Sequence, residues 1–273
     1  ANMKVIIKSY LDLIKLWWKF LNKWQFFALI SILGLTTGFR LWRINEYMPF
    51  LGDEGRDALV IKDLLVNHHF PFIGPPTSIG NIYLGPLYYY MMAVPMALFW
   101  LNPVAAAVEV AIIGVLTVFL IYYLGKQWFG ASAGIIAAFL YAISPVTIYY
   151  SRSSWNPNPA PFFTLLAFLG MYKAHISRNF LWLALVGFGV VAAVQMHYLA
   201  LILIPIVGVL WILELWLKIK RRANTKFFFR GTLLGILIFL ILMMPLAIFD
   251  LRHNFMNYRA VSEFFSNRET TVN

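Results

Sequence analysis

The chain has 273 residues, of which 61% are hydrophobic and only 12% are charged. Soluble domains carry about 25% charged residues, so this composition excludes an ordinary soluble fold. The formal net charge is +11, but most basic residues lie beside apolar runs, which is the pattern that orients membrane helices and argues against nucleic-acid binding. The chain has no cysteine, which excludes disulfides and thiolate metal sites.

The first 23 residues predict an amphipathic helix. Charged residues recur at spacings of three or four, namely Lys4, Lys8, Asp12, Lys15, Lys19 and Lys23, and apolar side chains such as Trp17 and Trp18 fill the remaining surface. We expect this helix to lie in the membrane interface on the cytoplasmic side. The alternative is a solvated leader to the first spanning helix.

The rest of the chain predicts helices that span a membrane, because its apolar runs are continuous and do not alternate. The apolar segments are 24–42, 86–100, 104–124, 131–150, 159–172, 180–195, 198–217 and 231–249. If all of them spanned, the basic cluster at 218–230 would lie opposite the N-terminal lysines, against the positive-inside bias.

Segment 86–100 is the one to remove, since it is shorter than the ~20 residues that a span needs and Pro95 interrupts it. We therefore predict that it is a helix lying against the outer face. Seven spanning helices remain. The segments that then lie outside are 43–103, 151–158, about 195–197 and 250–273.

Acidic residues are concentrated in the first of these outer segments, where five of the eleven in the chain lie between Glu46 and Asp63. Asp53 precedes a predicted helix at 54–67, for which it is a good N-cap. A carboxylate at an outer membrane surface can also act as a general base on an acceptor hydroxyl. The simpler alternative is a helix cap followed by a solvated first turn.

Cationic and polar residues fall in the other outer segments. The stretch SRSSWNPNPAP carries Arg152, which could bind phosphate through two donors or merely anchor a helix end at the interface. Arg252 is a second candidate cation. His197 lies near the outer ends of two helices, where a lone histidine is more often structural than functional.

Two further polar features remain. Glu109 lies inside the segment 104–124, so we expect it to face protein or a wet cavity, because a carboxylate in lipid is costly. His68 and His69 have no partner at metal-ligand spacing. The sequence therefore predicts no metal site, and dependence on a divalent metal is unsupported.

The stretches GDEGRDALVIKDLL, GPLYYYMMAVP and GVLTVFLIYYLGKQWFGASAGIIAAFLYAISPVTIYYSRSSWNPNPAPFFTLL occur in this order. In order and spacing they resemble the polyprenyl-phosphate-dependent glycosyltransferases of the GT-C superfamily. The likeness is strongest over residues 45–172, and it is to the branch of protein O-mannosyltransferases and lipid A aminoarabinose transferases. The resemblance implies an all-α membrane fold with two helices of the first external loop lying along the membrane.

The resemblance also implies a reaction. Asp53 would be the base that deprotonates or orients the acceptor, with Glu54 beside it, and the donor would be a sugar on a polyprenyl phosphate. The acceptor would be a glycan, lipid or protein at the outer face, and no cofactor is established. The residues expected to bind substrate or its phosphate are Arg152, Arg252, His197, Asn156 and Tyr88.

The expected organisation is an interfacial helix at 1–23, a GT-C transmembrane module at 24–255 and an external polar tail at 256–273. We expect the chain to be the N-terminal module of a longer protein in the plasma membrane of a bacterium or archaeon, with its N-terminus in the cytoplasm. One alternative is a non-catalytic lipid-binding or scaffold protein with this fold. A transporter is disfavoured, since charged residues are nearly absent from helix centres.

Overall fold

The computed structural model describes residues 23–78, 82–177 and 179–266. These residues form α-helices, one 3₁₀ helix and an isolated antiparallel bridge between Pro76 and Tyr83, and no strand occurs among them. The predicted all-α membrane fold is confirmed. The interfacial helix expected over residues 1–23 falls outside the described range, apart from Lys23.

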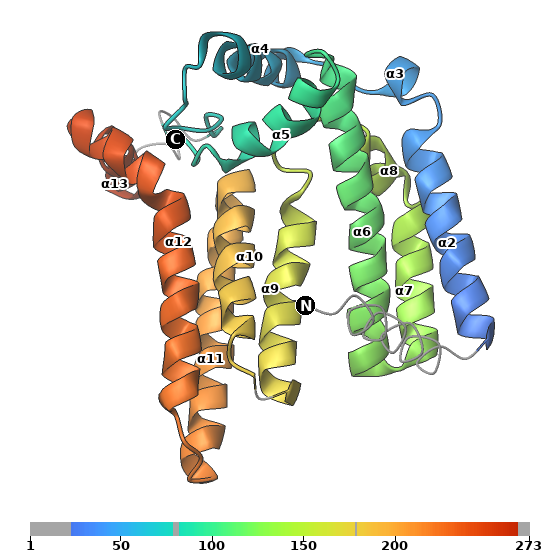
Figure 1. Ribbon diagram of the computed structural model, residues 1–273, viewed down its shortest axis with the longest axis vertical. Helices are drawn as coiled ribbons and strands as arrows, with labels where there is room; N and C mark the ends of the chain where they lie inside the picture. Colours follow the sequence, from blue (N-terminus) through green and yellow to red (C-terminus); the bar gives the residue numbers. More distant parts are fainter. Residues whose placement is uncertain (1–22, 79–81, 178, 267–273) are drawn as a thin grey trace, which may run out of the picture.

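The long helices pack in two groups (Figure 1). The first group contains α2 (Lys23–Leu41), α6 (Pro103–Phe129), α7 (Ala131–Ile143) and α8 (Pro145–Ser151). The second contains α9 (Ala160–Ser177), α10 (Trp182–Met196), the 3₁₀ helix η1 (Tyr198–Ile202), α11 (Leu203–Lys220) and α12 (Lys226–Arg252). Contact between α6 and α9 joins the two groups.

Four of the described helices, namely α2, α6, η1 with α11, and α12, are long and apolar enough to cross a membrane. The number rises to five if α7 and α8 are counted as one bent span. Helices α9 and α10 occupy the other two predicted segments and run alongside the rest (Figure 1). The chain is thus an integral membrane protein, and the count of seven spans stays a prediction.

The helices that belong to neither group gather at one end of the bundle (Figure 1). They are α3 (Ile44–Tyr47), α4 (Gly52–Asn67), α5 (Leu87–Leu98) and α13 (Met256–Ser266). Helix α5 contains Pro95 and lies across the bundle, as predicted for segment 86–100. Its buried side chains, among them Tyr88 and Met92, pack into the main hydrophobic core. This end is called the α4 end below.

The segment 131–150 is not the continuous helix that the sequence analysis expected. It breaks at Ser144, and α7 and α8 meet at an angle of 64°. Pro145 is the physical reason, because a residue before proline avoids the helical region and proline has no N–H to donate. The break leaves the carbonyl oxygen of Tyr141 without its usual helical partner.

Arg40 of α2 fills this break and is completely buried. Its guanidinium donates to four acceptors at the corner, which are the carbonyl oxygens of Tyr141 (3.4 Å) and Ala142 (3.1 Å) and the hydroxyls of Thr147 (3.2 Å) and Ser151 (3.2 Å). A guanidinium carries five N–H donors, so one side chain can donate to all four of these acceptors at the break. The sequence analysis placed Arg40 inside an apolar span and gave it no role.

Glycine allows helices α10 and α12 to approach each other closely. A Cβ atom placed on Gly187 of α10 would lie 2.1 Å from the carbonyl oxygen of Gly235 in α12. Any larger residue at 187 would push these helices apart, because backbone cannot move aside as a flexible side chain can. The contact between α10 and α12 therefore depends on these two glycines.

Glu109 lies in a groove between α5 and α6, as the cost of a carboxylate in lipid requires. The groove has a volume of about 610 Å³ and is otherwise lined mostly by apolar side chains such as Leu98 and Ile112. One carboxyl oxygen, Oε2, is buried and has no hydrogen-bond partner in the described part of the chain. Glu109 therefore lines a largely apolar groove, and the wet cavity expected for it stays a prediction.

The polar tail expected at 256–273 begins with a helix, α13. The carboxylate of Asp250 caps it by accepting from the backbone N–H groups of Asn257 (2.6 Å) and Tyr258 (3.3 Å). The side chain of Asn257 also exchanges two hydrogen bonds with the backbone of Tyr83, at 2.9 and 3.0 Å. These bonds fix the start of α13 against the segment between α4 and α5.

Replacing Arg40 with methionine should destabilise the protein by roughly 2–4 kcal/mol, because it leaves the Ala142 carbonyl oxygen without a donor and removes three further hydrogen bonds at the α7–α8 corner. Thermal unfolding in detergent would measure the loss. The matched control is Arg43→Met, since about half of the Arg43 side chain is exposed and its loss should cost less than about 0.5 kcal/mol. Equal stability of the two variants would contradict the role given to Arg40.

Candidate active site

A cavity of about 460 Å³ opens at the α4 end, between the start of α4 and the segment that follows α8. Its lining includes two carboxylates. The lining residues are Pro49, Leu51, Gly52, Asp53, Glu54, Tyr149, Tyr150, Ser153 and Trp155. The two carboxylates singled out in the sequence thus meet residues about one hundred positions later in the chain.

The expectation that Asp53 is the N-cap of α4 is wrong. The helix begins at Gly52, Leu51 is the N-cap, and Asp53 lies in the first turn. The carboxylate of Glu54 accepts from the backbone N–H of Leu51 at 3.0 Å, the reach-back bond of a capping box. Because Glu54 satisfies the helix end, the side chain of Asp53 is released from that task.

Asp53 is held from both sides while half of its side chain remains exposed. One carboxylate oxygen accepts from Nη1 of Arg56 at 2.8 Å, and the other accepts from the indole N–H of Trp155 at 3.2 Å. The Trp155 ring lies 6.0 Å from that of Tyr150, at a tilt of 32°. The carboxylate is therefore oriented inside the cavity and is still open to a ligand.

Glu54 connects the start of α4 with the segment that follows α8. It is buried, and its second carboxylate oxygen accepts from the hydroxyl of Ser153. The side chain of Asn158 then donates to the Ser153 carbonyl oxygen at 2.9 Å. The stretch SRSSWNPNP had marked a polar loop, but nothing in its spacing showed that Ser153 and Trp155 would contact the carboxylates.

Asp57 lies one helical turn after Asp53 and is almost fully buried. It accepts from Nη2 of Arg56 at 2.7 Å and from the hydroxyl of Tyr89 at 3.1 Å. Burial raises the pKa of Asp57 to about 6, although the neighbouring Arg56 guanidinium opposes the shift. Arg56 thus bridges an exposed carboxylate in the cavity and a buried one behind it.

Tyr88 and Asn156 lie behind the cavity and do not line it. The hydroxyl of Tyr88 donates to the carbonyl oxygen of Ser154, and burial raises the pKa of Tyr88 well above its usual value. The side-chain amide of Asn156 donates to the carbonyl oxygen of Met196 at 2.7 Å. Both residues hold the segment 151–158 in place.

The three expected cationic or imidazole residues lie at the α4 end but outside the cavity lining. Arg152 donates to the carbonyl oxygen of Trp42 at 2.7 Å, and its guanidinium lies over the ring of Tyr47. Arg252 is exposed near the ring of Phe72. Desolvation lowers the pKa of His197. The guanidinium that contacts Asp53 is that of Arg56.

The comparison with known proteins bears on the whole arrangement. The family model described as dolichyl-phosphate-mannose-protein mannosyltransferase matches residues 84–249, more than half of the chain. The chain belongs to this family. No curated protein matches the chain. The family assignment confirms the resemblance drawn from the sequence and makes the chain a membrane glycosyltransferase of the GT-C type.

The matched range of the mannosyltransferase family divides the cavity. Ser153 and Trp155 fall inside residues 84–249, whereas Asp53 and Glu54 precede them. The hydrogen bonds of Glu54 to Ser153 and of Asp53 to Trp155 are what join the two parts. In the described ranges, no group of three or more histidine and acidic side chains could hold a metal ion.

The stability of the protein should depend on the ionisation of Asp57. Because its pKa is raised in the folded protein, the stability that this residue contributes is complete below about pH 4 and is lost as the pH rises through about 6. We expect the unfolding midpoint of the wild type to fall relative to that of Asp57→Asn between about pH 4 and pH 7.

Thermal unfolding in one detergent across this pH range would measure the difference. The control is Asp63→Asn on the same helix, since Asp63 is exposed and contacts Asn67 and His69. A difference between wild type and Asp57→Asn that stays constant with pH would show that Asp57 does not titrate there.

Proposed function

We propose that this mannosyltransferase-family protein transfers a sugar from a polyprenyl phosphate to an acceptor, with Asp53 as the base. The family description names a mannose carried on dolichyl phosphate, which is such a donor, and a protein acceptor. The observation that carries the proposal is the half-exposed carboxylate of Asp53, held in a cavity by Arg56 and Trp155.

In the proposed reaction, a hydroxyl of the acceptor lies within hydrogen-bond reach of Asp53 and attacks the anomeric carbon of the donor sugar. A carbon–oxygen bond to the acceptor forms as the bond from the sugar to the phosphate oxygen breaks. The acceptor proton passes to the Asp53 carboxylate, and the polyprenyl phosphate leaves with the bonding electron pair. A base placed in this way contributes about 10²–10⁴-fold to the rate.

The leaving phosphate needs a cation, because its negative charge grows in the transition state. We assign this role first to Arg56, whose guanidinium is partly exposed beside Asp53. Arg252 is exposed at the end of α12 and is the second candidate. Arg152 would have to exchange its bond to the Trp42 carbonyl oxygen for one to phosphate.

Glu54 is proposed as a positioning residue. It is buried, and its oxygens are bonded to the backbone N–H of Leu51 and the hydroxyl of Ser153. It therefore sets the start of α4, and with it the place of Asp53, against the second external loop. We propose that Tyr88 and Asn156 act in the same way, through the loop backbone.

We propose that the donor lipid tail lies against the membrane helices and that the cavity opens to the outer face. The basic residues Lys126, Lys173 and the cluster at 218–230 belong to the opposite end of the bundle (Figure 1). The positive-inside bias supports placing that end in the cytoplasm. Residues 24–255 would form the transferase module.

Replacing Asp53 with asparagine should reduce sugar transfer by about 10²–10⁴-fold, because the amide cannot accept the acceptor proton. The measurement is transfer of labelled mannose from polyprenyl-phosphate mannose to acceptors in membranes that contain the protein. Asp63→Asn, at the far end of the same helix, should transfer at the wild-type rate. Wild-type activity in Asp53→Asn would refute the assignment of the base.

Replacing Trp155 with phenylalanine should lower kcat about tenfold, since it removes the N–H that orients Asp53 and keeps an aromatic ring in the cavity. The KM for the donor should change by less than about twofold, because the lost interaction serves the reacting geometry. The control is Trp100→Phe, as Trp100 is 96% exposed. A rise in KM with unchanged kcat would mean that Trp155 binds substrate and does not position Asp53.

A further inference from the structure

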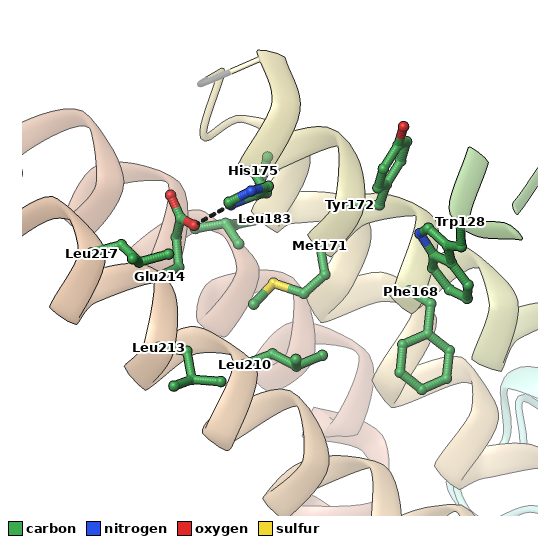
Figure 2. A pocket seen from close by; sticks show the side chains of 11 residues that line it. Trp128, Phe168, Met171, Tyr172, His175, Leu183, Leu210, Leu213, Glu214 and Leu217 are labelled. Atoms are coloured by element: carbon green, nitrogen blue, oxygen red, sulfur yellow. Dashed lines mark hydrogen bonds and ion pairs between the residues drawn. The ribbon is translucent and has the colours of Figure 1, made fainter.

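A second cleft lies at the end of the bundle opposite the Asp53 cavity, between α9, α10 and α11 (Figure 2). Its volume is about 440 Å³. Met171 of α9 and Leu210 of α11 project into it, and Trp128 and Phe168 form one wall (Figure 2). This cleft takes no part in the proposed transfer reaction, so its lining needs another explanation.

The cleft continues toward the α4 end as an apolar groove. A neighbouring cavity of about 520 Å³ shares Met171 and Leu183 with it and extends past Val207 to Ile204. Between Leu217 and Ile204, α11 rises about 20 Å, which is two-thirds of the ~30 Å hydrocarbon core of a bilayer. The two cavities together extend along most of α11 with a mostly apolar lining, as a binding site for a hydrocarbon chain must.

Four of the polar groups along the groove are paired with each other, and the Tyr172 hydroxyl donates to Gln127 at 2.8 Å. The ring nitrogen Nδ1 of His175 lies 2.6 Å from a carboxylate oxygen of Glu214 (Figure 2). Further along, the indole N–H of Trp211 donates to the hydroxyl of Thr232 at 2.9 Å. The remaining lining is aliphatic and aromatic, so the interior suits a hydrocarbon chain and offers little to a polar ligand.

Protein contacts hold α11 only loosely. Of its side chains, only Leu203 and Lys218 are buried, and the helix is far more exposed than α10. Interiors of proteins are close-packed, so a helix held at a distance from its neighbours by an apolar groove needs an apolar filling. In a membrane protein the surrounding lipid supplies such chains.

The mouth of the groove is basic. The basic residues at this end are Lys220, Arg221, Arg222 and Lys226 between α11 and α12, while Lys173 lies over the Tyr123 ring and Lys218 is buried over the Phe180 ring. Glu214 is the one acidic residue at this end of the described chain, and it already contacts His175. Clusters of lysine and arginine at a membrane surface attract anionic lipid headgroups.

We propose that this groove binds one acyl chain of an anionic phospholipid, whose phosphate lies against the basic residues at the mouth. His175 stands between the chain and the headgroup, and Glu214 orients its ring. The site is separate from the Asp53 cavity, so the proposal does not rest on the glycosyl transfer reaction. A neutral phospholipid or a polyprenyl chain would fit the apolar part but would not make equal use of the charge at the mouth.

The test is native mass spectrometry of the purified chain in detergent, titrated separately with phosphatidylglycerol, phosphatidylcholine and polyprenyl phosphate. We expect one phosphatidylglycerol to be retained at a concentration at least fivefold lower than phosphatidylcholine. Leu210→Trp, which fills the groove, should weaken this retention at least tenfold. The matched control is Val209→Trp on the exposed face of the same helix, which should bind like the wild type.

A second variant, Arg221→Gln with Arg222→Gln, keeps the groove and removes charge from its mouth. It should lose the preference for phosphatidylglycerol over phosphatidylcholine while it still retains one lipid, and it decides the matter if Leu210→Trp fails to fold. Equal retention of both phospholipids by the wild type would overturn the proposal. Displacement of phosphatidylglycerol by less than an equal amount of polyprenyl phosphate would assign the groove to that lipid instead.

Discussion

A buried arginine at a broken helix supports the part of this protein in which the chemistry is proposed to occur. Pro145 interrupts what would otherwise be one span, and Arg40 satisfies the oxygens exposed by the break, at distances of 3.1–3.4 Å. One of its acceptors, Ser151, is the last residue of α8, directly before the loop that carries Ser153 and Trp155. In lipid, where unpaired backbone groups are costly, the break can persist only with such a partner. The position of the segment 151–158 therefore depends on Arg40, inside the bundle.

The cavity itself depends on hydrogen bonds between the start of α4 and the segment that follows α8. Glu54 binds Ser153 and Asp53 binds Trp155, while Tyr88 and Asn156 tie the same loop to α5 and α10. Every one of these contacts joins residues far apart in the sequence. The proposed reaction needs a carboxylate that its substrates can reach, and a network of hydrogen bonds holds Asp53 in place without burying it.

Charge divides the molecule into two unlike ends. Acidic residues cluster on α4 at one end, and basic residues cluster around the ends of α9, α11 and α12 at the other. The proposed transfer uses the acidic end, where a base is needed, and the proposed lipid groove uses the basic end, where an anionic headgroup is attracted. The apolar helices between them carry little charge, and two of their charged residues, Arg40 and Glu109, lie beside a helix break and a groove.

The sequence by itself determined the class of protein and the approximate place of each long helix, and it singled out Asp53 and Glu54 as candidate site residues. It could do so because a bilayer demands continuous apolar runs and because charge in such a chain stands out. Only the tertiary structure decided that 131–150 breaks at Ser144, that Leu51 caps α4, and that Arg56 contacts Asp53. Hydropathy reports where a side chain can be buried and is silent on which distant group it will meet. Hydrogen bonds between loops, which form the cavity, are therefore settled by packing alone.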